Sequence, residues 1–150
     1  MSQVLSLRVP DQLAERLDRF ARRLGNGMTR TRAGVLLLEE ALREAEFALI
    51  EFRDSLVGRQ ACMKDSGLAV WEVILVAGHY GMDVEATARH LQRSTEWVRA
   101  AFNYYEAYRD EIDRAVEDNR IGYEAMKRLL PGLERFEVSL EGEQTPEPAR

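Results

Sequence analysis

The sequence predicts a mainly α-helical chain in which one short β-strand precedes the first helix. Three observations support this prediction. Residues 4–9 alternate with period two, residues 35–56 carry apolar side chains at steps of three and four, and capping residues precede the later apolar stretches. We expect one intermolecular strand plus two helices, followed by a trihelical domain with a helix-turn-helix-like arrangement.

Composition and charge narrow the classes of function. The 150 residues include 21 basic and 26 acidic side chains, and this net charge of −5 excludes a uniformly basic nucleic-acid coat. Residues 1–34, however, hold seven Arg against three acids, a local balance of +4. One Cys and two His make a Cys/His zinc site improbable and exclude an intrachain disulfide. With no membrane-length apolar run and no signal peptide, we expect a cytoplasmic protein.

The N-terminal segment predicts a strand followed by a short helix. Its side chains alternate between two faces, with Leu5, Leu7 and Val9 on one face and Val4, Ser6 and Arg8 on the other. Pro10 ends this strand because proline donates no hydrogen bond. No partner strand lies nearby in the sequence, so the unpaired backbone groups require a second chain. Residues 11–24 then form one apolar stripe of helical spacing, which Gly25-Asn26-Gly27 ends.

A long second helix is expected from Thr29 onward. Its apolar positions follow each other at alternating steps of three and four, namely Val35, Leu38, Leu42, Ala45, Leu49, Phe52 and Leu56. Such a stripe is either ordinary core or the seam of a dimer, and the lone strand favours the dimer.

A strand, a short helix, a glycine turn and a longer helix within the first 46 residues resemble the ribbon-helix-helix family of DNA-binding proteins. The matching residues are Leu5-Ser6-Leu7-Arg8-Val9-Pro10-Asp11, Leu13, Leu17, Leu24-Gly25 and Thr29-Arg30-Thr31. The resemblance implies a homodimer or a higher even oligomer whose paired strands enter the major groove of operator DNA. It implies base contacts from Val4, Ser6 and Arg8 and phosphate contacts from Thr29, Arg30 and Thr31. A dimerisation arm without DNA is the alternative.

The middle of the chain predicts three helices after a linker and a turn. We expect the linker at residues 58–61, the turn at 64–67 and the first helix within 70–80. Asp83 caps a short helix, and Ser94 or Thr95 begins a longer one that reaches Ile112. Residues 119–122 suggest a break in the helix.

Several strings in this region resemble a small trihelical, winged-helix-like domain of unknown function, common in antitoxins of the VapB type that are encoded beside PIN-type ribonuclease toxins. The strings are Ala69-Val70-Trp71-Glu72-Val73-Ile74, Gly81-Met82, Trp97-Val98-Arg99-Ala100-Ala101-Phe102-Asn103-Tyr104-Tyr105 and Arg109-Asp110-Glu111-Ile112-Asp113. The many acids among residues 83–113 favour packing over DNA contact here. Tyr104, Tyr105 and Tyr108 form either a partner surface or the cap of the core.

The C-terminal residues predict a segment that binds a partner. Residues 120–140 combine cations with apolar side chains, which suits the carboxylate-rich, metal-binding active site of a PIN-type nuclease. The expected toxin-binding residues are Lys127, Arg128, Leu130, Leu133, Arg135 and Phe136. Alternatively, this segment folds back on residues 70–112. Residues 141–150 are acidic and Pro-containing, so we expect disorder there.

No enzyme motif is present, and no catalytic residue, cofactor or metal is expected. His79 and His90 lack suitably spaced partners. The expected organisation is a DNA-binding and dimerisation domain at 1–57, an antitoxin-like domain at 58–119, a partner-binding segment at 120–140 and a tail at 141–150. The expected function is a VapB-type antitoxin that neutralises a PIN-type ribonuclease and represses its own operon. The alternatives are a stand-alone repressor with an oligomerisation or ligand-sensing C-terminal domain, and a purely structural dimer.

Overall fold

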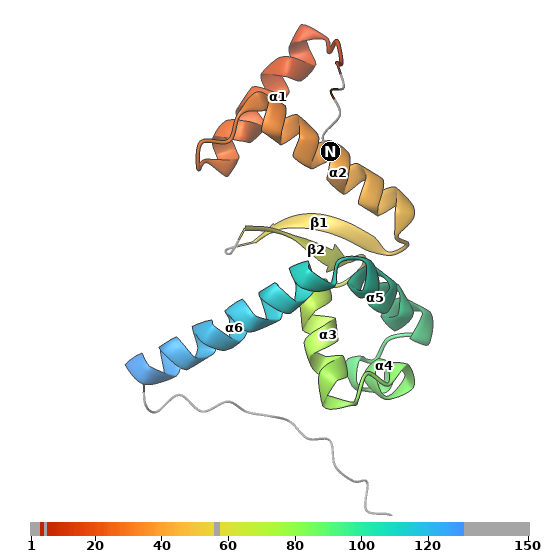
Figure 1. The fold of residues 1–150 in the computed structure, drawn as a ribbon. Helices are drawn as coiled ribbons and strands as arrows, with labels where there is room; N and C mark the ends of the chain where they lie inside the picture. Colours follow the sequence, from red (N-terminus) through yellow and green to blue (C-terminus); the bar gives the residue numbers. More distant parts are fainter. Residues whose placement is uncertain (1–3, 5, 56–57, 131–150) are drawn as a thin grey trace, which may run out of the picture. The chain divides into compact units, whose positions relative to one another are not determined.

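The computed structural model describes residue 4 and residues 6–55 and 58–130. Its elements in chain order are α1 (Asp11–Leu24), α2 (Arg30–Glu46), β1 (Ile50–Ser55), β2 (Gly58–Met63), α3 (Val70–His79), α4 (Val84–Leu91), α5 (Thr95–Ala107) and α6 (Arg109–Leu129) (Figure 1). The expected mainly α-helical class is confirmed. The chain divides into two compact units, Met1–Val116 and Glu117–Arg150.

Local signals fix both ends of α1 and the start of α2 as the sequence predicts. α1 follows Pro10 and ends at Gly25, which has a φ of +67° and donates its N–H to the carbonyl of Ala21. Glycine adopts this left-handed conformation without steric cost. Thr29 caps α2, because its hydroxyl accepts the N–H of Arg32 at 3.2 Å.

The N-terminal arm has no regular secondary structure at residue 4 or at residues 6–10. The expected strand is intermolecular, and a single chain offers it no partner. The ribbon therefore stays a prediction.

The expected extension of the second helix to Leu56 is wrong. α2 ends at Glu46, and Leu49 takes a φ of +63°, which turns the chain out of the helix. The backbone carbonyl of Leu49 then accepts the N–H of Lys64 at 2.7 Å. The β-branched and aromatic side chains of Ile50 and Phe52 suit a strand, and steps of three and four did not distinguish the two structures.

The expected linker at residues 58–61 is also wrong, because β2 begins at Gly58. β1 and β2 form an antiparallel pair whose register runs from Ile50 opposite Met63 to Ser55 opposite Gly58. Ile50 and Met63 are both fully buried. The turn predicted at 64–67 is confirmed.

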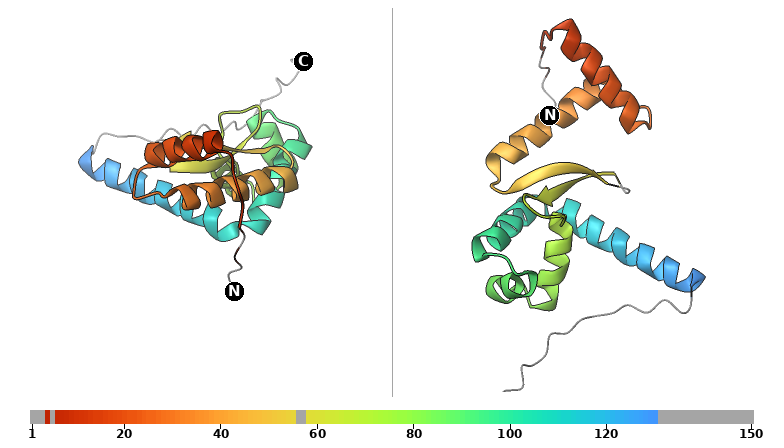
Figure 2. Two further views of the ribbon diagram at one scale, coloured as in Figure 1. Left: turned by 90° about the horizontal axis from the view of Figure 1, so that it is seen from above. Right: turned by 180° about the vertical axis from the view of Figure 1, so that it is seen from behind.

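The hairpin and the three helices α3, α4 and α5 share one hydrophobic core. β1 contacts α2 and α5, and β2 contacts α3, so the hairpin lies between α2 and these helices (Figure 1 and Figure 2). The buried core residues are Ile50, Ala61, Met63, Val70, Val73, Ile74, Ala88, Trp97, Val98, Ala101, Tyr104 and Ile112. Phe47, Leu49 and Phe52 pack against this core. Residues expected in the N-terminal domain therefore pack against the core that the hairpin shares with α3, α4 and α5. We call the hairpin and these helices the body.

The predicted caps of α4 and α5 are confirmed. Asp83 accepts the N–H of Ala86 at 2.6 Å, and Ser94 accepts the N–H of Trp97 at 3.2 Å. The long helix does not continue to Ile112 as expected, because α5 ends at Ala107 and α6 begins at Arg109.

The helix break expected at residues 119–122 is wrong, since α6 continues through Gly122 to Leu129. Glycine inside a helix costs only about 1 kcal/mol, and Arg120 forms an i,i+3 ion pair with Glu117. Residues 123–129 therefore form the second half of α6. The tail expected at residues 141–150 lies outside the described residues.

No described helix combines the length and the apolar character that a membrane span requires.

Candidate nucleic-acid interface

The arm residues expected to contact bases are all exposed. Val4 is 96% exposed, and Ser6 and Arg8 are also exposed. In a single chain they follow each other along an irregular segment, so the ribbon face that the sequence predicts is not assembled.

The residues expected to contact phosphate lie at the start of α2. Thr29 is its cap, and Arg30 and Thr31 occupy the first exposed turn. Arg30 is engaged, however, by Asp18 of α1. Its Nε donates to Asp18 Oδ1 at 2.8 Å, and its Nη2 donates to Asp18 Oδ2.

This ion pair changes the electrostatics at the start of α2. The hydrogen bond from Arg30 lowers the pKa of the Asp18 carboxyl and raises the pKa of the guanidinium. The charge of Arg30 is thus partly compensated, whereas the neighbouring Arg32 is exposed and has no ion-pair partner among the described residues. Asp18 lies on α1, and no spacing in the sequence indicates that it faces Arg30 across the turn.

Apolar side chains of the arm, α1 and α2 are exposed rather than buried. They are Leu7 (61%), Val9 (40%), Leu13 (40%), Val35 (59%), Leu38 (48%) and Leu42 (61%). We call this set the N-terminal apolar face. α1 also lines a groove of about 430 Å³ together with Leu37 of α2. Within the described residues, these two helices bury only Ala21, Ala33 and Glu40.

Arg43 joins α2 to the body through contacts that the sequence analysis missed. Its Nη1 donates to the hydroxyl of Tyr104 at 2.8 Å and to Glu111 at 2.7 Å, and its Nη2 donates to Glu39 at 2.5 Å. The guanidinium lies 3.8 Å from the ring centre of Tyr108. Burial alone lowers the pKa of Arg43, but its hydrogen-bond acceptors outweigh burial and raise it.

Tyr104 and Tyr108, which lie next to Arg43, pack in the core or against it and do not form a free partner surface. Tyr104 is fully buried, and burial raises the pKa of its hydroxyl. Phe47 packs edge-on against Tyr104 and Tyr108, with ring centroids 5.3 and 5.7 Å away. The hydroxyl of Tyr105 donates to Asp113 at 2.8 Å. Tyr108, with φ −126° and ψ 42°, stands between the end of α5 and the start of α6.

A second contact between α2 and the body centres on Glu40. Its carboxylate is 8% exposed and accepts the Nε of Arg59 at 2.7 Å, while Arg59 also bonds Asp54 at 3.0 Å. Burial raises the pKa of the Glu40 carboxyl, and the pairing with Arg59 only partly offsets this effect.

The expected toxin-binding residues are partly described. Lys127 and Arg128 lie in the last turn of α6 and are exposed, and Leu130 follows the helix with 56% exposure. Exposed apolar side chains accompany them at Ile121, Met126 and Leu129. Leu133, Arg135 and Phe136 lie outside the described residues.

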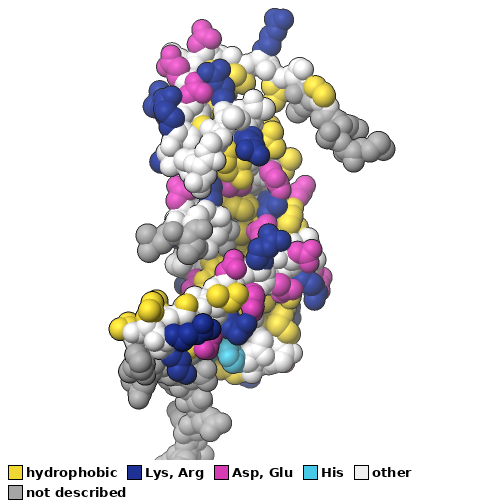
Figure 3. Space-filling view, turned by 60° about the vertical axis from the view of Figure 1, so that its left-hand side comes forward, with side chains coloured by type: hydrophobic (Ala, Val, Ile, Leu, Met, Phe, Trp, Pro, Cys, Tyr) yellow, Lys and Arg dark blue, Asp and Glu magenta, His cyan; other side chains and the backbone are white. Residues whose placement is uncertain are grey.

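The remaining candidate groups are engaged or buried. Nδ1 of His90 lies 2.8 Å from the hydroxyl of Tyr80, and the thiol of Cys62 is buried, which raises its pKa. Among the described residues, no three His, Cys, Asp or Glu side chains gather in a potential metal site. On the face seen in Figure 3, Lys and Arg lie among Asp and Glu and do not form one continuous basic surface.

Comparisons of the chain with protein-family models, with curated proteins and with solved structures found no match.

Proposed function

We propose that the chain forms a homodimer through its arm and its N-terminal apolar face. The observation that carries this proposal is the exposure of Leu38 and Leu42 on helices that bury only two apolar side chains of their own. A two-helix module of this size buries too little surface for independent stability. A second copy related by a two-fold axis covers the same side chains on both chains.

Light scattering at micromolar concentration tests the dimer. We expect twice the chain mass of 17.2 kDa for the native chain and the monomer mass for the double variant Leu38→Asp, Leu42→Asp. Leu129→Asp on α6 is the matched control, since Leu129 is 82% exposed but lies outside the N-terminal apolar face. A monomeric native chain would contradict the proposal.

The proposed dimer binds operator DNA through a ribbon formed by its two arms. Exposure of Val4, Ser6 and Arg8 and the excess of Arg in residues 1–34 support this role. Arg8→Ala is expected to cost about 1–3 kcal/mol of specific binding and to relax sequence preference. Arg30→Ala is expected to weaken binding to all sequences alike. Native-like binding by Arg8→Ala would show that the ribbon does not contact the bases.

The proposed biological role is that of a VapB-type antitoxin that neutralises a PIN-type ribonuclease and represses its own operon. The exposed cations and apolar side chains at the end of α6 support it, because a carboxylate-lined nuclease site attracts cations on an amphipathic segment. Purification of the tagged chain from its own operon tests the role. A nuclease that copurifies supports the antitoxin, and recovery of the chain alone favours a stand-alone repressor.

A further inference from the structure

The geometry from α4 to α5 is that of a helix-turn-helix. α4 ends at Leu91, the following residue Gln92 has a left-handed conformation with φ 53° and ψ 46°, and α5 begins at Thr95 after a turn of three residues. The N–H of Arg93 donates to the carbonyl of Ala88 at 3.0 Å, which closes the end of α4. A turn of three residues sets two helices at a steep angle.

The packing inside this pair matches that geometry. Small or β-branched side chains face inward where the helices meet, since Ala88 is 4% exposed and Val98 and Ala101 are fully buried. α4 and α5 contact each other, and both contact α3. The opposite side of α5 is therefore turned outward, with Arg99 and Asn103 exposed on it.

The outward side carries available positive charge. Residues 86–105 hold three Arg (Arg89, Arg93 and Arg99) and one acid, Glu96, which gives a local charge of +2. The three arginines are exposed, and none forms an ion pair with a residue that the structure describes. The guanidinium of Arg93 lies 5.3 Å from the ring centre of Trp97, which holds it beside the start of α5.

Glu96 is the one acid between these arginines. Hydrogen bonds to its own backbone N–H and to the side chains of Ser94 and Thr95, together with the nearby charge of Arg99, lower its pKa and keep it ionised. Its negative charge therefore weakens the attraction of this side for phosphate. The acids Glu85 and Glu106 lie at the two far ends of the motif.

We propose that the outward side of the α4–α5 helix-turn-helix is a second contact site for duplex DNA on this chain. Arg99 and Asn103 are exposed on α5, the second helix of the motif, which in such motifs meets base edges, and these two residue types pair with guanine and adenine. Arg89 and Arg93 lie where phosphates flank the groove. The inference does not depend on the N-terminal ribbon.

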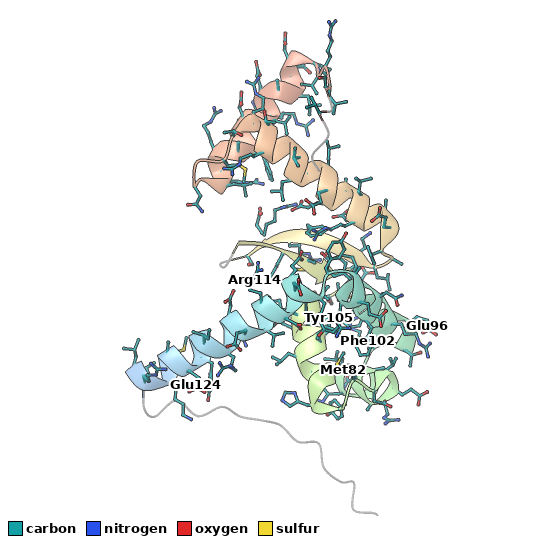
Figure 4. All side chains as sticks on the ribbon, in the orientation of Figure 1. Met82, Glu96, Phe102, Tyr105, Arg114 and Glu124 are labelled. Carbon is teal, nitrogen blue, oxygen red and sulfur yellow. The ribbon has the colours of Figure 1, made fainter. Side chains whose placement is uncertain are left out.

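Fluorescence anisotropy with a 30-base-pair mixed-sequence duplex, from 50 to 200 mM salt, tests the site on the full chain. Arg89→Ala with Arg99→Ala is expected to weaken binding about tenfold and to reduce the salt slope by about 1, from the phosphate contact of Arg89. Arg114→Ala is the matched control, because Arg114 is an exposed arginine of α6 away from the motif (Figure 4). Unchanged binding by the double variant would overturn the proposal.

A variant that gains affinity separates the site from simple loss of folding. Glu96→Gln removes the one acid from the centre of the site and is expected to tighten binding severalfold at 50 mM salt. Glu124→Gln, at an exposed position of α6 outside the motif, is expected to change affinity little. Equal effects of the two substitutions would also overturn the proposal.

The two DNA proposals fail in distinguishable ways. If Arg8→Ala weakens binding and the α4–α5 double variant does not, the ribbon alone contacts DNA. If the double variant weakens binding and Arg8→Ala does not, the helix-turn-helix alone contacts DNA. Absence of binding by the native chain at 50 mM salt would exclude both.

Discussion

At the scale of single residues, the contacts between α2 and the body depend on two charged side chains. Glu40 is buried with its carboxylate on Arg59, and Arg43 lies between Tyr104, Tyr108 and Glu111. Burial of charge is unfavourable unless partners compensate it. Removal of one partner therefore lowers the free energy of unfolding by more than the net contribution of the pair.

Glu40→Ala is expected to destabilise the chain by about 1–3 kcal/mol, because it leaves the partly buried guanidinium of Arg59 with Asp54 as its remaining acceptor. Urea unfolding followed by circular dichroism measures the change. Glu39→Ala is the matched control, since Glu39 is 56% exposed and shares Arg43 with other acceptors. Equal losses in the two variants would show that the Glu40–Arg59 pair has no special role.

The same residue predicts a pH dependence. Burial raises the pKa of Glu40, so the folded chain holds its proton more tightly than the unfolded chain does. The contribution of Glu40 to the free energy of unfolding is then greatest below the ordinary pKa of about 4.3. This contribution falls as the pH rises through the raised pKa of the folded chain. Glu40→Gln is expected to flatten this fall, as measured by unfolding midpoints between pH 4 and pH 7. An unchanged profile would contradict the assignment.

At the scale of elements, the sequence predicted the helix caps, which depend on local contacts, but not the helix ends that depend on tertiary packing. Thr29, Asp83 and Ser94 were predictable caps because each acts on N–H groups two or three residues away. The end of α2 could not be predicted, because Leu49 and Phe52 fit the spacing of a helix as well as that of a hairpin. Their packing against the core determines which of the two structures forms. The break at Tyr108 between α5 and α6 was likewise not predicted from the sequence.

The candidate site shows the same division. The exposure of Arg8 and the place of Thr29 follow from the sequence pattern. The pairing of Arg30 with Asp18 joins two helices across a turn, and the pairing of Glu40 with Arg59 joins a helix to a strand that the sequence analysis did not predict. Such contacts depend on the arrangement of elements, which no local spacing encodes.

The turn between α4 and α5 offers a stabilising substitution. Gln92 is exposed and has a φ of 53°, a conformation that costs a residue with a Cβ about 1 kcal/mol. Gln92→Gly is expected to raise the melting temperature, because glycine removes this cost. Arg89→Gly in the preceding helix is the control, and there we expect a loss of about 1 kcal/mol. A lower melting temperature for Gln92→Gly would contradict the prediction.

At the scale of the whole molecule, the two compact units predict separable roles. The core cluster ends at Ile112, and the described part of the unit Glu117–Arg150 adds no residue to it. The body and the proposed DNA contacts therefore require only residues up to the first half of α6.

Truncation after Asn119 is expected to leave the chain folded, dimeric and able to bind DNA, and to abolish inhibition of the PIN-type nuclease that we propose as its partner. Circular dichroism, anisotropy and a ribonuclease assay measure the three properties. Full inhibition by the truncated chain would place the partner contact elsewhere, with the surface around Tyr105 as the next candidate. Loss of folding would show that the end of α6 completes the core.

The stacking of Arg93 on Trp97 gives the native chain an optical reporter. The indole Nε1 of Trp97 donates to the carbonyl of Lys64 at 3.3 Å, while that of Trp71, the other tryptophan, donates to the side chain of Gln60 at 3.2 Å. A ligand that draws Arg93 away removes a cation from one indole only. The emission of a Trp71→Phe chain then follows occupancy of the α4–α5 turn without any attached dye.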